Sequence, residues 1–255
     1  MLVDIVKERN MQVFKEGKLS DVSDYMVVEE NLRIILNGHE LVTLACTPEA
    51  TKQLAVGYLF SEGLLNSRED IKNLQADDPL VVSIETFSPA TLPAGARKIN
   101  TCMGKGGAEL PEPLPLATEI PRYDPWHLLA LIHELDSTSF TFQRTGGVHS
   151  AALGDNKAML FRYEDIGRHN AVDKTIGHAV LEGFTLQDKC LLLSGRIASE
   201  ILIKAARNRI PVIVSRSAPT LLAVELAEKL GVTIVGFARG RSFNLYSHGE
   251  RIKLE

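Results

Sequence analysis

The three cysteines are the first residues of this chain to consider for covalent chemistry. Cys46 lies in LACT and Cys190 opens CLLL, two apolar contexts in which cysteine usually packs as a small hydrophobic side chain. Cys102 differs, because it lies in the glycine-rich stretch NTCMGKGG, with Lys105 three residues further on. Exposure and a nearby cation both favour the thiolate, the form that attacks sulfur and carries a persulfide. Cys102 is therefore the candidate for sulfur chemistry, and an incidental loop cysteine is the alternative.

A second group of chemically active residues follows three short apolar runs in the last third of the chain. The runs Cys190–Leu193, Pro211–Val214 and Val232–Val235 are separated by the helical patterns Ile197–Arg207 and Leu221–Leu230. Strands alternating with helices at this spacing predict a parallel sheet that is covered on both faces. The carboxyl ends of all three strands then lie at one edge of the sheet.

Arginine and serine recur in the turns after these three runs. The turns contain Ser194, Gly195 and Arg196, then Ser215, Arg216 and Ser217, then Phe237, Ala238, Arg239, Gly240, Arg241 and Ser242. Ligands of such sheets bind outside the carboxyl ends of the strands, where helix N-termini and backbone amides favour anions. The sequence thus predicts a ligand that carries phosphate, and the alternative is that these arginines are simply solvated.

Polar residues also crowd the stretch Arg144–Gly177, RTGGVHSAALGDNKAMLFRYEDIGRHNAVDKTIG. Its glycine pair lets backbone amides approach a ligand closely. Lys157–Arg162 is predicted to form a strand, from which EDIGRHN, with Arg168 and His169, leads into a helix.

The apolar residues of this helix recur at helical spacing, at Val172, Ile176, Ala179 and Val180. Asn170, Asp173 and Lys174 therefore share the opposite, polar face. Polar residues are mostly exposed, so a solvated helix face and a functional face are both left open.

The first half of the chain contains a predicted hairpin and a helix. Residues 27–44 alternate and include Asn37-Gly38, a strong signal for a two-residue hairpin turn. Thr47 and Pro48 indicate an N-cap and a first helical residue, which predicts a helix over residues 48–61. Val81–Phe87 is a further predicted strand. In Ser88–Pro121 glycine and proline accumulate without periodicity, which predicts a mobile loop.

Order is predicted to resume at Asp124 and Pro125, again an N-cap and a first helical residue. The apolar pattern predicts a helix over Trp126–Leu135 and then a strand over Phe140–Gln143.

Composition limits the functional classes. The chain has 255 residues, 45% hydrophobic and 24% charged, which is ordinary for a globular protein. Its net charge of −4 argues against nonspecific binding to nucleic acid or to an anionic membrane. The apolar runs are shorter than a membrane span and the N-terminus lacks the apolar core of a signal peptide, so we expect a cytoplasmic protein. Three cysteines give neither a disulfide framework nor a paired metal-ligand spacing, and no metal site is predicted.

Six segments of the chain resemble those of the formate dehydrogenase accessory sulfurtransferase family, the FdhD proteins. These segments are TPEATKQLAVGYLFSEGLL, RTGGVHSAAL, EDIGRHNAVDK, LLLSGRIASEILIKAA, PVIVSRSAPT and VGFARGRSFNLYS. The resemblance implies an α/β fold like that of cytidine deaminases, with a mixed sheet covered by helices on both faces and a smaller N-terminal α+β part. We expect residues 1–122 to form an N-terminal α+β region that ends in the mobile cysteine-bearing loop, and residues 123–255 to form an α/β cofactor-binding domain.

The resemblance also implies a function. Such a homodimer takes persulfide sulfur from a cysteine desulfurase and transfers it to the bis-molybdopterin guanine dinucleotide cofactor, containing molybdenum or tungsten, of formate dehydrogenase. Cys102 matches the family's persulfide cysteine, and Phe237–Ser242 match its cofactor-binding segment. Many members have a Cys-x-x-Cys pair in the loop, whereas Lys105 replaces the second cysteine here. A scheme that requires two loop thiols is therefore excluded. The predicted cofactor-binding residues are Arg168, His169, Ser194, Gly195, Arg196, Ser215, Phe237, Ala238, Arg239, Gly240, Arg241 and Ser242.

Two other functions are alternatives to sulfur transfer. A zinc-dependent deaminase needs a Pro-Cys-x-x-Cys motif to hold zinc, and this motif does not occur in the chain. A noncatalytic chaperone for the molybdenum cofactor would use the arginine-bearing turns alone, with Cys102 incidental. This second alternative stays open on the sequence.

Overall fold

The computed structural model describes residues 4–87, 97–99, 110–113 and 122–253, which form three β-sheets and six α-helices within these ranges. The predicted α/β class with a mixed sheet is confirmed. Cys102 and Lys105 lie outside the described residues, as does most of the predicted loop Ser88–Pro121. Within that loop, the short strand β7 (Arg97–Ile99) pairs in parallel with a strand of the N-terminal half.

The largest sheet has six strands in the order β13-β12-β11-β10-β8-β9. Their bounds are β8 (His149–Gly154), β9 (Met159–Asp165), β10 (Cys190–Leu193), β11 (Val212–Ser215), β12 (Thr233–Arg239) and β13 (Ser242–Ser247). The three predicted strands β10, β11 and β12 are parallel neighbours, as expected, whereas β8 and β13 run antiparallel to them.

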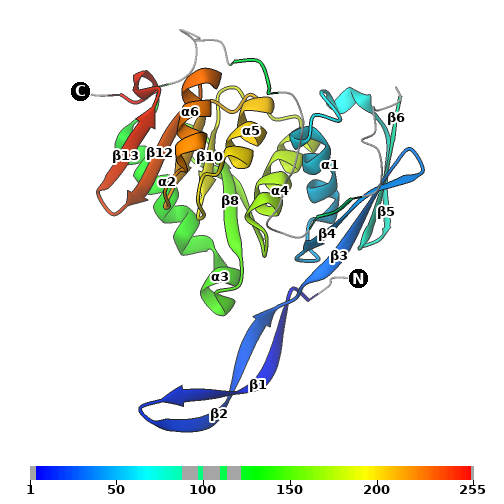
Figure 1. Ribbon diagram of the computed structural model, residues 1–255, viewed down its shortest axis with the longest axis vertical. Coiled ribbons are helices and arrows are strands. Elements are labelled where there is room, and N and C mark those ends of the chain that lie inside the picture. Colours follow the sequence, from blue (N-terminus) through cyan, green and yellow to red (C-terminus); the bar gives the residue numbers. More distant parts are fainter. Residues whose placement is uncertain (1–3, 88–96, 100–109, 114–121, 254–255) are drawn as a thin grey trace.

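Helices cover both faces of this sheet, as predicted from its continuous apolar strands (Figure 1). The helices are α2 (Pro125–Thr138), α4 (Arg168–Leu181), α5 (Ser199–Arg207) and α6 (Leu221–Leu230). Leu191 and Leu193 of β10 belong to one hydrophobic cluster with α4, α5 and α6, while Cys190 and Leu192 belong to a second cluster with α2. Alternate side chains of a strand point to opposite faces, so α2 covers one face and the other three helices cover the other.

A five-stranded sheet, β5-β6-β3-β4-β7, forms the N-terminal half. Its strands are β3 (Glu30–Leu36), β4 (His39–Cys46), β5 (Ile71–Asp78), β6 (Val81–Thr86) and β7, and a short 3₁₀ helix, η1 (Arg68–Asp70), precedes β5. The predicted hairpin is confirmed, because Asn37 and Gly38 connect β3 and β4 with φ angles of 51° and 81°.

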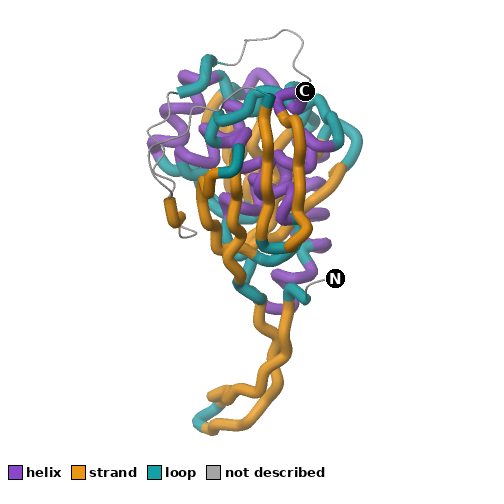
Figure 2. Tube along the Cα trace, turned by 90° about the vertical axis from the view of Figure 1, so that its right-hand side faces the viewer, coloured by secondary structure: helices purple, strands orange, loops and turns teal. Residues whose placement is uncertain are grey.

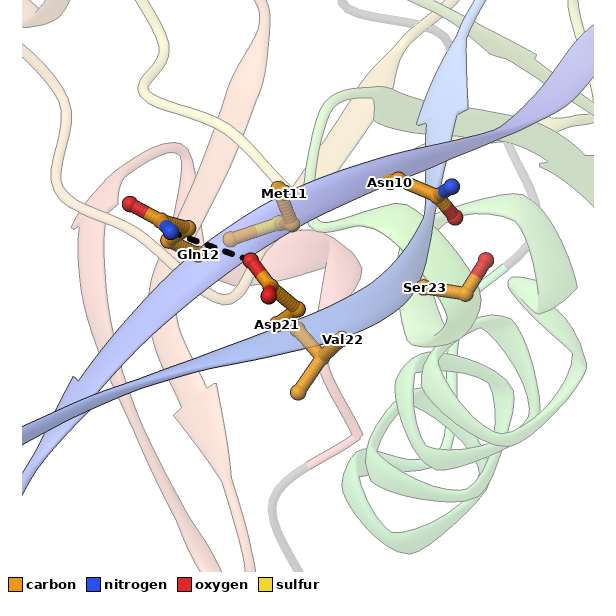
Figure 3. Close-up of a pocket in the computed structure, with 6 residues that line it drawn as sticks. All are labelled: Asn10, Met11, Gln12, Asp21, Val22 and Ser23. Atoms are coloured by element: carbon orange, nitrogen blue, oxygen red, sulfur yellow. Dashed lines mark hydrogen bonds between the residues drawn. The ribbon is translucent and has the colours of Figure 1, made fainter.

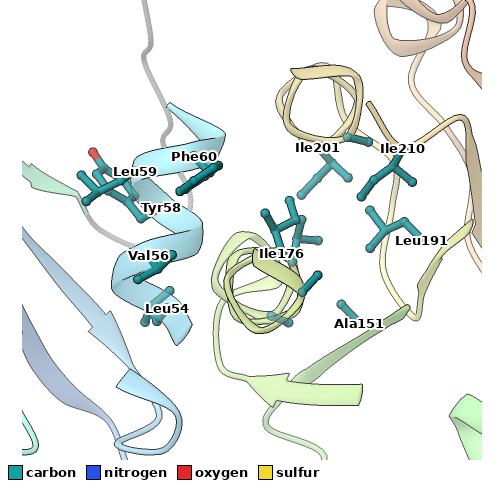
Figure 4. Close-up of a cluster of buried hydrophobic side chains, with 14 of the residues drawn as sticks. Leu54, Val56, Tyr58, Leu59, Phe60, Ala151, Ile176, Leu191, Ile201 and Ile210 are labelled. Atoms are coloured by element: carbon teal, nitrogen blue, oxygen red, sulfur yellow. The ribbon is translucent and has the colours of Figure 1, made fainter. Parts of the chain in front are cut away.

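Helices α1 (Thr51–Ser61) and α4 lie between the two large sheets. They approach very closely at two glycines: a Cβ added at Gly57 would lie 1.8 Å from the Asp173 carbonyl oxygen, and one at Gly177 would lie 1.9 Å from that of Gln53. Leu54 of α1, Ile176 of α4 and Leu191 of β10 belong to a single hydrophobic cluster that joins both halves (Figure 4). The domain boundary between residues 122 and 123 stays a prediction.

The predicted start of α1 is wrong. The helix begins at Thr51, after Ala50 with a φ of 54°, and not at Pro48. Thr47 does not cap it, because its backbone amide and its hydroxyl donate to the Asp165 carboxylate, 3.1 and 3.0 Å away. A tertiary contact therefore uses the side chain that would have capped the helix.

The predicted strand over Phe140–Gln143 is also wrong, because these residues belong to the short helix α3 (Phe140–Thr145). The Glu164 carboxylate accepts hydrogen bonds from the amides of Thr141 and Phe142, 3.1 and 2.9 Å away. A carboxylate at a helix N-terminus satisfies amides that lack partners within the helix. By contrast, α2 is capped as predicted, since the Asp124 side chain accepts from the amide of His127.

A long hairpin of β1 (Val6–Lys15) and β2 (Lys18–Val27) was not predicted from the sequence. It turns at Glu16 and Gly17, with φ angles of 52° and 80°, and projects away from the rest of the molecule (Figures 1 and 2). Its base is held by α3, where the Arg144 guanidinium lies 3.6 Å from the centroid of the Tyr25 ring. Among the described helices, none is long and apolar enough to cross a membrane.

Candidate functional site

The carboxyl ends of four strands meet at one edge of the six-stranded sheet. β9 and β10 both pair antiparallel with β8, so β9 runs in the same direction as β10, β11 and β12. β9 therefore delivers Arg168 and His169 to the edge at which the three predicted turns lie, and β8 begins there with His149. We call these strand ends and turns the basic edge.

The three predicted turns are hydrogen-bonded to one another. The Ser215 hydroxyl donates to the carbonyl oxygen of Gly195 at 2.7 Å, which joins the turns after β10 and β11. The Phe237 amide donates to the Ser217 carbonyl at 3.1 Å, and Arg239 Nε donates to the Arg216 carbonyl at 2.8 Å. The sequence-based expectation that these turns share one edge is confirmed.

The third turn differs from its predicted form. β12 continues to Arg239, and the chain reverses at Gly240 into β13. Arg239, Gly240, Arg241 and Ser242 thus form the tip of a hairpin rather than a strand-to-helix turn. Phe237 has a φ of 51°, in the left-handed region that few aromatic residues adopt. Backbone strain of this kind persists only where the surrounding structure enforces it, here at the first residue of the predicted cofactor-binding segment.

The arginines of the basic edge are not equivalent. Arg196, Arg239 and Arg241 are exposed, whereas Arg216 is half-buried and forms an ion pair with Asp136 at 3.0 Å. Burial raises the pKa of Asp136, against the opposing effect of Arg216. The Arg241 guanidinium lies 5.3 Å from the centre of the Trp126 ring. Arg216 therefore has an internal counter-ion, while Arg196, Arg239 and Arg241 present charge to the solvent.

His149 lies inside this edge, although the sequence assigned it no role. A Cβ added at Gly195 would lie 3.3 Å from His149 Nδ1 and 3.8 Å from the Cβ of Arg168, so the glycine permits this close packing. Burial lowers the pKa of His149, and the charges of Arg168 and Arg196 lower it further. His149 is thus held neutral among cations. Its position two residues after the glycine pair Gly146-Gly147 was the signal available in the sequence.

Three more side chains, those of His169, Glu200 and Arg168, complete the edge. His169 Nε2 lies 3.3 Å from the carboxylate of Glu200, which belongs to the first turn of α5 and was not predicted. Arg168 Nε is buried, and within the described residues it has no hydrogen-bond partner. A buried donor without a partner is costly, so an incoming acceptor at this point would be favoured.

The start of α4 is fixed by a buried network around Asp165. One carboxylate oxygen accepts from the Gly167 amide and the Asn170 side chain, each at 2.9 Å. The other lies 2.7 Å from Lys174 Nζ, which also donates to the Thr47 hydroxyl at 2.7 Å. This network holds the turn that presents Arg168 and His169.

The polar face of α4 that was predicted from the sequence is not solvated. Asn170, Asp173 and Lys174 are all buried, because this face packs against α1 and the end of β4. The Asp173 carboxylate accepts hydrogen bonds from the Ser61 hydroxyl at Oδ1 and from Lys204 Nζ at Oδ2, each 2.6 Å long. The pKa of Asp173 is raised by burial, although Lys204 opposes the effect.

The two cysteines within the described residues are poor nucleophiles. Cys46 and Cys190 are both fully buried, and burial raises the pKa of each thiol to about 12. Neither forms a thiolate at neutral pH, which agrees with the packing role predicted for them. Nor does any group of three His, Cys, Asp or Glu side chains in the described ranges come together as a metal site.

Comparisons with a family model, with individual sequences and with solved structures all match the chain to FdhD proteins or formate dehydrogenase accessory proteins. The sequence model of the FdhD/NarQ family matches residues 27–253. The chain is 42% identical to the sulfur carrier protein FdhD of Bacillus subtilis strain 168, over 96% of this chain and 97% of the relative. It is 39% identical to the protein of the same name from Staphylococcus aureus strain Newman, over 94% and 93% of the two chains. A crystal structure of a candidate formate dehydrogenase accessory protein from Desulfotalea psychrophila shares the fold, with a TM-score of 0.81, 24% identity and coverage of 98% and 100%.

Proposed function

Because the chain belongs to the FdhD/NarQ family, we propose that it is a sulfur carrier that serves the maturation of formate dehydrogenase. The observation that carries this proposal is the 42% identity, over nearly the full length, to a relative named as a sulfur carrier. The basic edge supports it independently, since it offers arginines that have no acidic partner among the described residues, at the place where α/β sheets bind phosphate-bearing ligands.

Cys102 is the residue that we propose to carry the sulfur, as a persulfide received from a cysteine desulfurase. A thiol has to ionise before it can attack sulfur, and the burial of Cys46 and Cys190 disfavours ionisation of both. The lysine three residues after Cys102 is a cation of the kind that stabilises a thiolate. Elimination of the two buried cysteines and the family resemblance thus both favour Cys102 as the residue that carries the sulfur.

The proposed acceptor of the sulfur is the bis-molybdopterin guanine dinucleotide cofactor, which we treat as a bound substrate. Its phosphates suit the basic edge, where Arg196, Arg239 and Arg241 are exposed and Arg168 Nε is buried without a described partner. Charge-assisted hydrogen bonds from guanidinium groups to phosphate are strong and directional. Whether molybdenum or tungsten is carried does not enter this argument, because the edge would hold the nucleotide part. We further propose that the protein is homodimeric, as the resemblance implies, and cytoplasmic, as expected from its sequence.

A complementation experiment tests the sulfur-carrier function. Cells that contain Cys102→Ser as their only copy should lack formate dehydrogenase activity, while Cys46→Ala and Cys190→Ala should retain it. The two core substitutions remove packed side chains and are expected to cost stability rather than function. Full activity with Cys102→Ser would instead support the alternative, a noncatalytic cofactor chaperone that uses the basic edge alone.

A further inference from the structure

The projecting hairpin has two exposed faces, and neither of its edges pairs with another strand in the described part of the chain. A two-stranded hairpin alone is marginally stable in water, and three or more strands are normally needed for independent stability. Yet the Phe14 and Leu19 side chains near its tip are 69% and 65% exposed, and Val22 and Met26 are also exposed. Exposed apolar groups on an unpaired ribbon indicate that another surface covers it.

The outer edge of β2 is ready to pair. Lys15 and Lys18 face each other across a two-residue turn and form the first hydrogen-bonded pair of the hairpin. Along β2, every second residue counted from Lys18 therefore bonds to β1 through its backbone. The amides and carbonyls of alternate residues, from Leu19 to Tyr25, consequently point to the free edge. The Tyr25 amide donates to the neighbouring Asp24 carboxylate at 2.8 Å, as expected for an amide that faces away from β1.

We propose that this edge pairs antiparallel with the same edge of a second copy of the chain, with Val22 on the two-fold axis. The two hairpins would then form one four-stranded sheet in the order β1-β2-β2-β1. This inference goes beyond sulfur transfer and gives the proposed homodimer a specific interface.

The charges on β2 favour this register. With Val22 on the axis, Asp21 faces Ser23 and Asp24 faces Ser20 of the partner, and Lys18 lies diagonal to the partner's Asp24. Opposite charges and hydroxyl–carboxylate pairs stabilise neighbouring strands, whereas like charges that face each other destabilise them. An axis at Asp21 would oppose two carboxylates, and an axis at Ser23 would place Val22 against a carboxylate.

The outer edge of β1 is less suitable for self-pairing. An axis at Met11 would set Lys7 opposite Lys15, and an axis at Gln12 would set Arg9 opposite the same lysine of the other copy. Both arrangements bring like charges together across the interface.

Apolar side chains also agree with the Val22 axis. Met11 and Val22 are cross-strand partners, so the four-stranded sheet would have a continuous row of Met11, Val22 and their two counterparts. Both residues line a groove of about 530 Å³ in the middle of the hairpin, which a partner's side chains could fill (Figure 3). The same pairing places Leu19 beside the partner's Tyr25, at the hairpin base where α3 exposes Phe140 and Phe142.

A cross-linking experiment tests this register in the full chain. Directly opposed residues that do not share ladder hydrogen bonds have Cα atoms about 4.5 Å apart, within the range that a disulfide spans. In a Cys102→Ser background, Val22→Cys should form a disulfide-linked dimer on mild oxidation. Val13 lies on β1 and on the same face of the hairpin as Val22. The Val13→Cys variant should stay unlinked, because the two copies of β1 are the strands at opposite edges of the sheet.

Light scattering on size-exclusion fractions gives a second readout. Val22→Lys should weaken the dimer at least tenfold, whereas Val22→Thr should preserve it. Val22 is 37% exposed in one chain, so the lysine is compatible with folding of the monomer. A dimer that neither responds to Val22→Lys nor links through Val22→Cys would overturn the proposed interface and leave the homodimer intact. A monomeric parent protein would overturn both.

Discussion

Lys174 and Arg239 are both cations in crowded polar surroundings, yet their environments are opposite. Lys174 is 0% exposed and lies between Asp165, Thr47 and the backbone carbonyl of Glu164. Arg239 is exposed, and within the described residues its side chain makes one hydrogen bond, from Nε to the backbone carbonyl of Arg216 in the turn after β11. The α1–α4 interface thus satisfies its charges internally, whereas the basic edge leaves charge available for a ligand.

This difference separates structural from functional polar residues. Buried charges need partners, because removing an ion from water without one is very costly. The interface meets this requirement with two ion pairs, Asp165 with Lys174 and Asp173 with Lys204. At the basic edge, the Arg168 Nε is buried but lacks a described partner, and three arginines have no acidic partner within the described residues. The first region positions the second, since the Asp165 network fixes the turn that carries Arg168.

The largest expected effect comes from breaking the buried pair. Lys174→Met should leave the Asp165 carboxylate buried without its ammonium partner, which typically costs about 3–5 kcal/mol. Denaturant unfolding measures this loss. Lys52→Met on the exposed side of α1 is the matched control and should change the free energy of unfolding little. Equal stability of the two variants would contradict a structural role for the Lys174 pair.

A smaller effect is expected from removing charge at the basic edge. Arg239→Ala should lower the affinity for guanosine diphosphate about tenfold, because a charge-assisted bond to phosphate is lost. Its stability should change little. Calorimetric titration measures the affinity, and Arg209→Asn is the control, since Arg209 is an exposed arginine before β11, at the opposite edge of the sheet. Asparagine tolerates the φ of 59° at that position. Unchanged affinity in Arg239→Ala would place the nucleotide elsewhere.

The smallest effect concerns the pH dependence of stability at His149. The pKa of His149 is lowered in the folded protein, so the unfolded chain binds a proton first as the pH falls. Neutral His149 therefore contributes stability above its ordinary pKa of about 6.5, and this contribution is lost as the pH falls through the lower folded value. Denaturant unfolding of the unsubstituted protein and of His149→Gln at pH 8 and pH 5 measures this effect. The gap between their free energies of unfolding should be narrower at pH 5 than at pH 8. A gap that is equal at the two pH values would contradict this role of His149.

The basic edge was largely predictable because it depends on local patterns. Short apolar runs separated by helical spacing defined β10, β11 and β12, and parallel strands necessarily bring their carboxyl ends together. His149 and Glu200 were missed, since one reaches the edge from an antiparallel strand and the other from the helix after the turn. Neither position follows from the periodicity of its own segment.

The errors of prediction arose where tertiary contacts overrode local signals. Thr47 has the side chain of an N-cap, but Asp165 recruits it from far along the chain. The apolar pattern predicted a strand over Phe140–Gln143, whereas the Glu164 carboxylate caps a helix there. The sequence left open whether the polar face of α4 is solvated or functional, because its partners on α1 and α5 are distant in sequence. Glu16-Gly17 was a usable turn signal for the first hairpin, but its strands lack the apolar alternation that marks a buried face.

Mass spectrometry of the cysteine peptides tests the central claim most directly. After incubation with a cysteine desulfurase and cysteine, the peptide that contains Cys102 should gain one sulfur atom. The peptides that contain Cys46 and Cys190 should gain none, because both thiols are buried and their pKa values are raised to about 12. An unmodified Cys102 peptide, or sulfur on either buried cysteine, would contradict the account.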